Sequence, residues 1–180
     1  TFDRAYDALV QIIGEIANGF SFLMNSDKLS KNEKEQYQGI IQIKDGKYHM
    51  SDGVVISSLK VLSQLLTKHY GKNTIFIIDE YDVPLDKAFQ HGYYDEMVEL
   101  IRGILGKVLK TNDYLQFAIL TGCLRISKES IFTGINNFKV LSILDARFDE
   151  QFGFSDDEVK NLLADYGLAS HFEEAKEWYD

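Results

Sequence analysis

The stretch 74–78, TIFII, is the sequence feature that most constrains the fold of this chain. It is an apolar, mostly β-branched run that begins after the helix-stopping Gly71 and ends in Asp79 and Glu80. Such a continuous run is typical of a strand that is covered on both faces, as strands of parallel sheets are. A second apolar run, LQFAIL over 115–120, also ends in polar residues. We therefore predict an α/β fold built around parallel strands.

Helical periodicity surrounds these two runs. Apolar residues recur at helical spacing over 3–16, 54–70 and 93–109, and each stretch predicts an amphipathic helix. The connection before residue 54 is charged and rich in turn formers, with room for a short helix around 31–41. Because 93–109 lies between the two apolar runs, we expect a right-handed crossover in which a single helix joins two parallel strands.

The carboxyl-terminal third predicts further elements. KVLSIL, 139–144, is a candidate third strand, and SDDE over 155–158 is a capping box that opens a helix ending at Gly167. Another helix is expected over 170–179. No internal repeat or linker divides the chain, which predicts one domain. Its expected parts are a helix and variable connection (1–50), the sheet core (51–145) and carboxyl-terminal helices (146–180).

Composition restricts the environment and the partners. The 180 residues, 45% of them hydrophobic, are enough for one domain with a sizeable core. A net charge of −9 disfavours direct binding to nucleic acid or to an anionic membrane. A single cysteine excludes an internal disulfide, and without a long apolar run or a signal peptide the expected location is the cytoplasm.

Isolated reactive side chains favour structural roles. Cys123 follows the second apolar run with no histidine nearby in sequence, so we expect a buried structural thiol rather than a nucleophile. The histidines are scattered without the spacing of a metal site and are expected at the surface or at helix caps. They are His49, His69, His91 and His171.

Polar residues at the two strand ends form the candidate site. Asp79 and Glu80 follow the first run and Thr121 follows the second, and carboxyl ends of parallel strands meet at one edge of a sheet. There an acid can hold Mg²⁺, and an adjacent glutamate can deprotonate the water that attacks a γ-phosphate. Surface strands also often end in acids that are merely solvated, and this second interpretation stays open. Asp82 is expected to solvate the following loop or to support the Mg²⁺ site, and Pro84 to fix the backbone of that loop.

The order of longer segments resembles the AAA-ATPase-like family over nearly the whole chain. The segments are IIDEYDVPL, HGYYDEM, LQFAILTGCLRISKESIFTGINNFKV and RFDEQFGFSDDEV. That family is bacterial and similar to the STAND-type branch of P-loop ATPases, and its longer members often carry a PD-(D/E)xK nuclease-like domain. The resemblance implies Walker B roles for Asp79, as the Mg²⁺ ligand, and for Glu80. It implies a sensor position for Thr121 next to bound ATP. Arg125, a source of positive charge for catalysis, and Lys128 lie in the TGCLRISKES segment.

The sequence departs from the family at one motif. It contains no G-x-x-x-x-G-K-[ST], since Lys72 is followed by Asn73 and Lys107 by Val108. The resemblance places that phosphate-binding loop upstream, so we expect the carboxyl-side portion of an ASCE-type three-layer P-loop fold, truncated on its amino-terminal side and inactive alone. The open flank of its sheet should then be covered by 1–50 or by another copy of the chain. The alternative is a non-catalytic acidic interaction module or the regulatory domain of a nuclease-associated protein.

Overall fold

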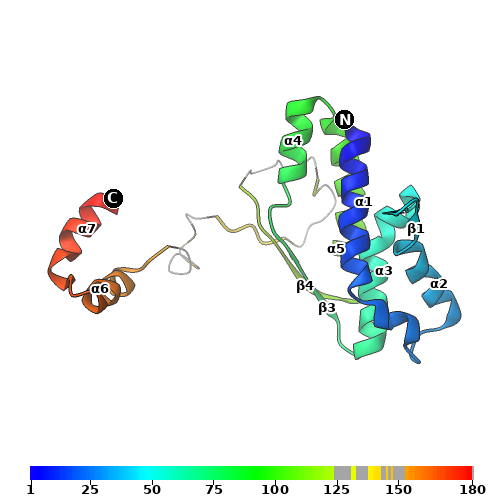
Figure 1. Ribbon diagram of the computed structural model, residues 1–180, viewed down its shortest axis with the longest axis horizontal. Coiled ribbons are helices and arrows are strands. Elements are labelled where there is room, and N and C mark those ends of the chain that lie inside the picture. The colour runs from blue at the N-terminus through cyan, green and yellow to red at the C-terminus, as the bar shows by residue number, and fades with distance from the viewer. Residues whose placement is uncertain (124–130, 133–137, 143–144, 146, 148–152, 180) are drawn as a thin grey trace. The chain divides into compact units, whose positions relative to one another are not determined.

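A computed structural model describes residues 1–123, 131–132, 138–142, 145, 147 and 153–179 of the chain (Figure 1). The chain divides into two compact units, Thr1–Asn136 and Asn137–Asp180. The elements of the first unit are α1 (Phe2–Asn18), the 3-10 helix η1 (Ser21–Asn25), α2 (Lys31–Ile40), β1 (Ile43–Lys44), β2 (Lys47–Tyr48), α3 (Asp52–Tyr70), β3 (Thr74–Ile78), α4 (Val83–His91), α5 (Tyr94–Leu109) and β4 (Leu115–Leu120). No helix of the described residues is long and apolar enough to cross a membrane.

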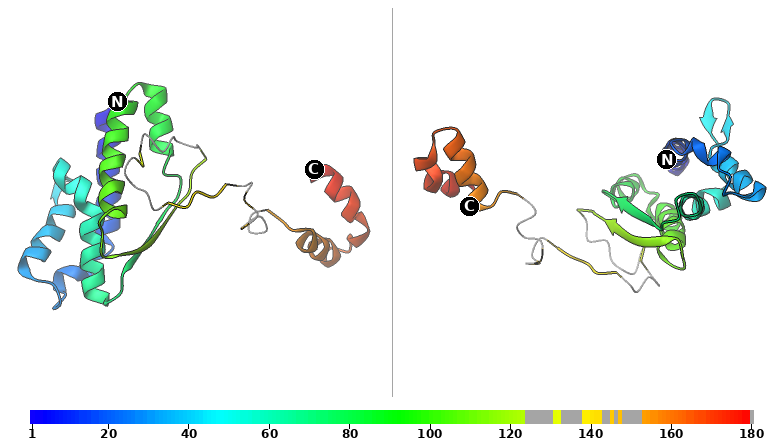
Figure 2. Two further views of the ribbon diagram at one scale, coloured as in Figure 1. Left: turned by 180° about the vertical axis from the view of Figure 1, so that it is seen from behind. Right: turned by 90° about the horizontal axis from the view of Figure 1, so that it is seen from below.

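Helix α3 is the centre of the first unit. It packs against α1, α2, α5 and β3, so it connects the amino-terminal helices to the sheet and to α5 (Figures 1 and 2). The helices predicted over 3–16, 31–41, 54–70 and 93–109 are confirmed as α1, α2, α3 and α5. Gly71 ends α3 in the left-handed conformation with φ 71°, and its N–H donates to the carbonyl of Thr67 at 2.7 Å.

Strands β3 and β4 form a parallel two-stranded sheet, as the two apolar runs predict. The register pairs Ile75 with Phe117 and Ile78 with Leu120. Helix α3 contacts β3 and α5 contacts β4, and the side chains that alternate toward these helices, such as Phe76, are half-buried. The chain is thus an α/β protein whose helices cover one face of a parallel strand pair.

The opposite face of this sheet is more exposed than predicted. Ile75, Ile77, Phe117 and Ile119 share it and are exposed by 48, 73, 46 and 48%. The expectation of strands covered on both faces is therefore wrong for the described residues. The segment 1–50 packs on α3, and its strands β1 and β2 form a separate antiparallel sheet. No strand of that segment extends the β3–β4 sheet.

The connection between β3 and β4 contains two helices instead of the single one predicted. Helix α4 begins directly after Asp82, with Pro84 in its first turn. Proline is tolerated there because backbone N–H groups of the first turn have no acceptor within the helix, so the missing N–H costs no hydrogen bond. It ends at Gly92, which has φ 76°. Pro84 thus starts a helix rather than fixing a loop. The third strand predicted over 139–144 is also wrong for residues 139–142, which form no strand, and 143–144 lie outside the described residues.

The second unit contains a short helical hairpin. Its elements are α6 (Asp156–Asp165), the 3-10 helix η3 (Ala169–His171) and α7 (Phe172–Tyr179). The predicted capping box is confirmed, because the Ser155 N–H donates to Glu158 Oε2 at 2.9 Å and the Glu158 N–H donates to Ser155 Oγ at 3.4 Å. Both predicted helices of this region are therefore present.

A second capping box lies in the first unit and includes a partly buried ion pair. Glu33 is 8% exposed, accepts from the N–H of Ser30 at 2.9 Å and is paired with Lys68 of α3. The Lys68 ammonium, followed by the Ser30 donors, lowers the pKa of Glu33 from an ordinary 4.5 to about 2. Because this pKa is depressed in the folded state, the pair stabilises the fold above pH 4.5 and loses its effect as the pH falls toward 2.

Replacing Glu33 by Gln should lower the free energy of unfolding at pH 7 by about 1–2 kcal/mol, since a cap contact and an ion pair are weakened. The variant should also lose less stability than the parent chain between pH 4.5 and 2. Urea denaturation over this range measures both effects. Glu35→Gln in the same helix is the control, because the Glu35 side chain is 59% exposed. Equal pH dependence in the parent chain and in Glu33→Gln would contradict the assignment.

Candidate functional site at the strand ends

The carboxyl ends of β3 and β4 are joined by backbone hydrogen bonds. The Thr121 N–H donates to the carbonyl of Ile78 at 2.9 Å, and the Tyr81 N–H donates to the carbonyl of Thr121 at 3.0 Å. The residues that leave the two strands therefore lie beside each other. This confirms the prediction that Asp79 and Thr121 share one edge of adjacent parallel strands.

Two polar side chains and one backbone N–H group meet at this edge. The hydroxyl of Thr121 donates to Oδ1 of Asp79, and the same hydroxyl oxygen accepts the N–H of Glu80 at 3.3 Å. All three residues are exposed. Glu80 has φ 52°, a left-handed conformation that residues with a Cβ adopt infrequently. The backbone thus adopts a disfavoured conformation at Glu80, and because Asp79 and Glu80 are exposed, both residues are accessible to a ligand from solvent.

Asp82 lies beneath this edge and is buried, which corrects the expectation that it solvates the loop. It is 3% exposed, and its carbonyl accepts the N–H groups of Leu85 and Asp86 at 2.9 and 3.0 Å as α4 begins. A Cβ added at Gly122 would lie 2.8 Å from both Asp82 Oδ1 and Tyr81 Cε1. Only glycine therefore lets β4 leave the sheet so close to the loop that carries the acids.

Tyr81 forms the apolar side of the same turn. Its ring lies 5.5 Å from that of Phe132, edge to face. Burial, and then the negative charge of Asp82, raises the pKa of the Tyr81 hydroxyl. Tyr81 therefore stays protonated at neutral pH and acts as a packing residue beside the exposed acids.

Oxygen ligands at this edge suit Mg²⁺ that arrives with a phosphate. Within the described residues no group of three or more His, Cys, Asp or Glu side chains is placed to hold a metal ion. Mg²⁺ is usually held by one or two carboxylates together with substrate phosphates and water, so a single exposed carboxylate is a sufficient protein ligand. Asp79, with the Thr121 hydroxyl beside it, fits that requirement.

The structure does not test two further predicted residues, and it corrects the prediction for one cysteine. Arg125 and Lys128 lie outside the described residues. Cys123 is exposed, so the predicted buried thiol is wrong. The reason is that β4 ends at Leu120, and the chain has already left the covered face of the sheet when it reaches Cys123.

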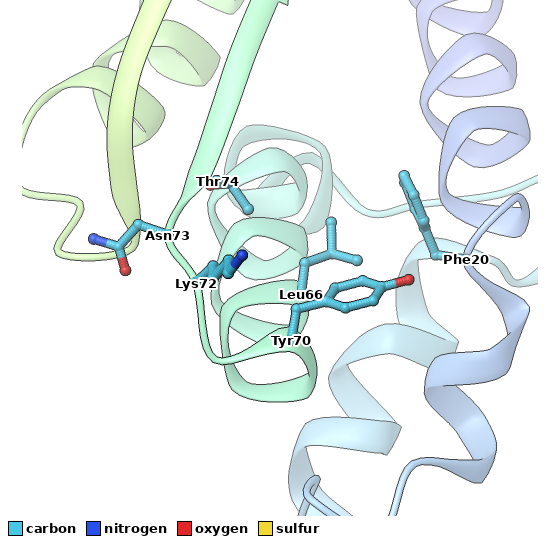
Figure 3. Close-up of a pocket in the computed structure, with 6 residues that line it drawn as sticks. All are labelled: Phe20, Leu66, Tyr70, Lys72, Asn73 and Thr74. Carbon is cyan, nitrogen blue, oxygen red and sulfur yellow. The ribbon is translucent and has the colours of Figure 1, made fainter.

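An open pocket lies at the other end of β3. It is lined by Phe20, Leu66, Tyr70, Lys72, Asn73 and Thr74 (Figure 3). Lys72 belongs to one of the three Gly-Lys pairs of the sequence, none of which is part of a phosphate-binding motif. Since Thr74 begins the strand and Asp79 follows its last residue, the whole length of β3 separates this pocket from the acids. The pocket is therefore a separate feature from the strand-end site.

The fold and the strand-end acids together define an α/β protein with its polar groups gathered where parallel strands end. The model of the AAA-ATPase-like family, described as a predicted AAA-ATPase, matches residues 13–132, about two thirds of the chain. The chain belongs to this family.

A curated relative shares the matched region. It is described as an uncharacterized protein in the vnfD 5′ region of Azotobacter chroococcum mcd 1, and it is 27% identical over 111 residues. That similarity covers 61% of this chain and 21% of the relative, so the chain spans about a fifth of the protein it matches. No solved structure matches.

Proposed function

We propose that the strand-end site is the acidic part of an ATP-hydrolysing site of the P-loop type. The observation that supports it is the convergence of Asp79, Glu80 and Thr121 at the carboxyl ends of two adjacent parallel strands. Nucleotide sites of open α/β sheets lie at this edge. Membership of a family described as a predicted AAA-ATPase also supports ATP hydrolysis as the function.

Each residue has a distinct task in this proposal. Asp79 binds the Mg²⁺ that accompanies the phosphates of ATP, and when bound the ion neutralises charge that develops on them. Glu80 accepts a proton from the attacking water, for which its exposed carboxylate is accessible. Thr121 occupies the sensor position beside both acids. Arg125 is proposed as a source of positive charge near the phosphates.

The proposal requires a phosphate-binding loop that these 180 residues do not contain. Backbone N–H groups and a lysine of such a loop provide most of the contacts that bind a triphosphate. We propose that an upstream part of the same domain supplies it and completes an ASCE-type three-layer fold, and that another copy of the chain is a possible cover for the open flank of the sheet. The site would then work in the cytoplasm of a bacterium, within a STAND-like ATPase.

The 180-residue chain is expected to bind Mg·ATP only weakly and to hydrolyse it no faster than buffer, because the loop is missing. The same chain joined at its amino end to the family's phosphate-binding loop segment should bind Mg·ATP and release phosphate. Isothermal calorimetry and a phosphate-release assay on both proteins compare them directly. Rapid hydrolysis by the 180-residue chain, or no binding by the joined protein, would contradict the proposal.

The exposed sheet face favours a second candidate function. Ile75, Ile77, Phe117 and Ile119 form an apolar patch on a chain of net charge −9, and such patches are common at protein contacts. The segment would then be a non-catalytic interaction module or the regulatory domain of a nuclease-associated protein. In that case substitutions at Asp79 and Glu80 would leave partner binding unchanged, whereas Ile77→Lys would abolish it.

A further inference from the structure

We infer that Thr121 is a positioning residue that sets the orientation of the Asp79 carboxylate and the backbone conformation of Glu80. The sensor position proposed above concerns contact with the nucleotide, whereas this role concerns contacts with Asp79 and Glu80 of the same chain. The inference rests on the proposed function, since it concerns how the two acids of that site are held.

The hydroxyl of Thr121 contacts the Asp79 carboxylate and the backbone N–H of Glu80 at the same time. A hydroxyl carries one proton, and here that proton is donated to Oδ1 of Asp79. The same oxygen accepts the N–H of Glu80 at 3.3 Å. While Thr121 donates to Asp79 it cannot also donate to a phosphate oxygen. Holding the acids and contacting a phosphate are therefore alternative states of this one side chain.

The conformation of Glu80 gives the second contact its importance. Residues with a Cβ are disfavoured at a φ of 52°, so other interactions must stabilise the turn at Glu80. The Thr121 hydroxyl is one of them, because it accepts the Glu80 N–H. Loss of this acceptor is expected to let the backbone at Glu80 leave its present conformation more often. Glu80 is the residue that would accept the proton from water.

Backbone contacts in the same turn do not depend on the Thr121 side chain. The Tyr81 N–H donates to the Thr121 carbonyl, and the Thr121 N–H donates to the Ile78 carbonyl. A substitution at position 121 that leaves the backbone of β4 in place therefore leaves both backbone hydrogen bonds intact. The contribution of the hydroxyl can therefore be measured apart from the joining of the strand ends.

Water-exchange NMR on the 180-residue chain tests the role without nucleotide. In Thr121→Val, which keeps the shape and removes the hydroxyl, the Glu80 amide should exchange about fivefold faster, the factor expected for one neutral hydrogen bond. The amides of Tyr81 and Thr121 should keep the parent exchange rates and serve as internal controls. Thr121→Ser retains the hydroxyl and should restore slow exchange at Glu80. Unchanged exchange at Glu80 in the valine variant, or a serine variant that behaves like valine, would overturn the inference.

Turnover by the chain joined to the phosphate-binding loop separates this inference from the proposed function. Thr121→Val should lower kcat with little change in KM, and Thr121→Ser should recover most of kcat, because the residue acts through the acids. Faster exchange at Glu80 without ATP hydrolysis in any version would support the positioning role and overturn the ATPase proposal. If ATP hydrolysis fell in Thr121→Val while amide exchange at Glu80 stayed unchanged, the ATPase proposal would be supported and the positioning role overturned.

Discussion

Replacing Glu80 by Gln is expected to lower the rate of ATP hydrolysis by about 10²- to 10⁴-fold in the chain joined to a phosphate-binding loop, which is the contribution of a positioned general base. The amide keeps the shape and polarity of the side chain but does not accept a proton at neutral pH. Binding of Mg·ATP should stay close to that of the parent protein. Single-turnover phosphate release together with calorimetry measures the two quantities separately.

Two further variants complete this experiment. Asp79→Asn should weaken the metal-dependent part of ATP binding as well as turnover, because it removes the charge that attracts Mg²⁺. Glu99→Gln is the matched control, since Glu99 is an exposed acid of α5 that contributes nothing to the strand ends. Full activity in Glu80→Gln would exclude that residue as the base. If Glu99→Gln lowered the rate of ATP hydrolysis as much as Glu80→Gln, the effect would come from the general loss of negative charge.

Replacing Leu65 by Ala should lower the free energy of unfolding by about 2–5 kcal/mol, as large-to-small changes in cores do. Leu65 is 0% exposed and lies in α3, the helix that packs on α1, α2, α5 and β3. Because the side chain is fully enclosed, relaxation of the surroundings can fill the cavity only in part. Urea denaturation followed by circular dichroism measures the loss.

Ile16→Ala is the matched control for this core substitution. Ile16 is as large as Leu65, but it is 51% exposed on α1, so its removal should cost much less. Similar losses for the two variants would contradict the assignment of α3 as the centre of the first unit. They would indicate that α1 is also covered on its outer side.

The long periodic helices and the two apolar strands could be predicted because each depends on local patterning. Helix α4 was missed for a local reason too, since DVPLDKAFQHG reads as a polar loop with a proline. Its buried residues Leu85 and Ala88, three apart and followed by a glycine stop, are the signal that could have identified it. The two-helix connection did not disturb the site, because the parallel pairing alone brings the strand ends together.

The tertiary details of the site could not be predicted from sequence. Asp79, Glu80 and Thr121 were identified because they follow apolar runs. The burial of Asp82 depends on the close passage of Gly122, a contact between segments about 40 residues apart in the chain, and local patterns contain no such information. The exposed sheet face was unforeseen for a similar reason, since apolar residues alone do not show what covers them.

The contacts between the β1–β2 hairpin and α1 also could not be predicted from local sequence patterns. The Gln11 side chain donates to the Tyr48 carbonyl at 3.1 Å and accepts its N–H at 3.2 Å, which ties β2 to α1. A Cβ at Gly14 would lie 2.2 Å from the Tyr48 ring. The glycine in the middle of α1 is therefore explained by a residue of strand β2, which is distant in sequence. Nothing in the periodicity of α1 indicates it.

Paramagnetic NMR with Mn²⁺ and ATP tests the central claim most directly, because broadening detects even weak and transient binding. Mn²⁺ takes the place of Mg²⁺ and broadens amide signals near the metal. In the 180-residue chain we expect broadening at Asp79, Glu80 and Thr121, and its loss in Asp79→Asn. Signals of Lys72 and Thr74, at the other end of β3, should stay sharp. Broadening at Lys72 and Thr74 with sharp signals at the strand-end acids would contradict a nucleotide site at this edge of the sheet.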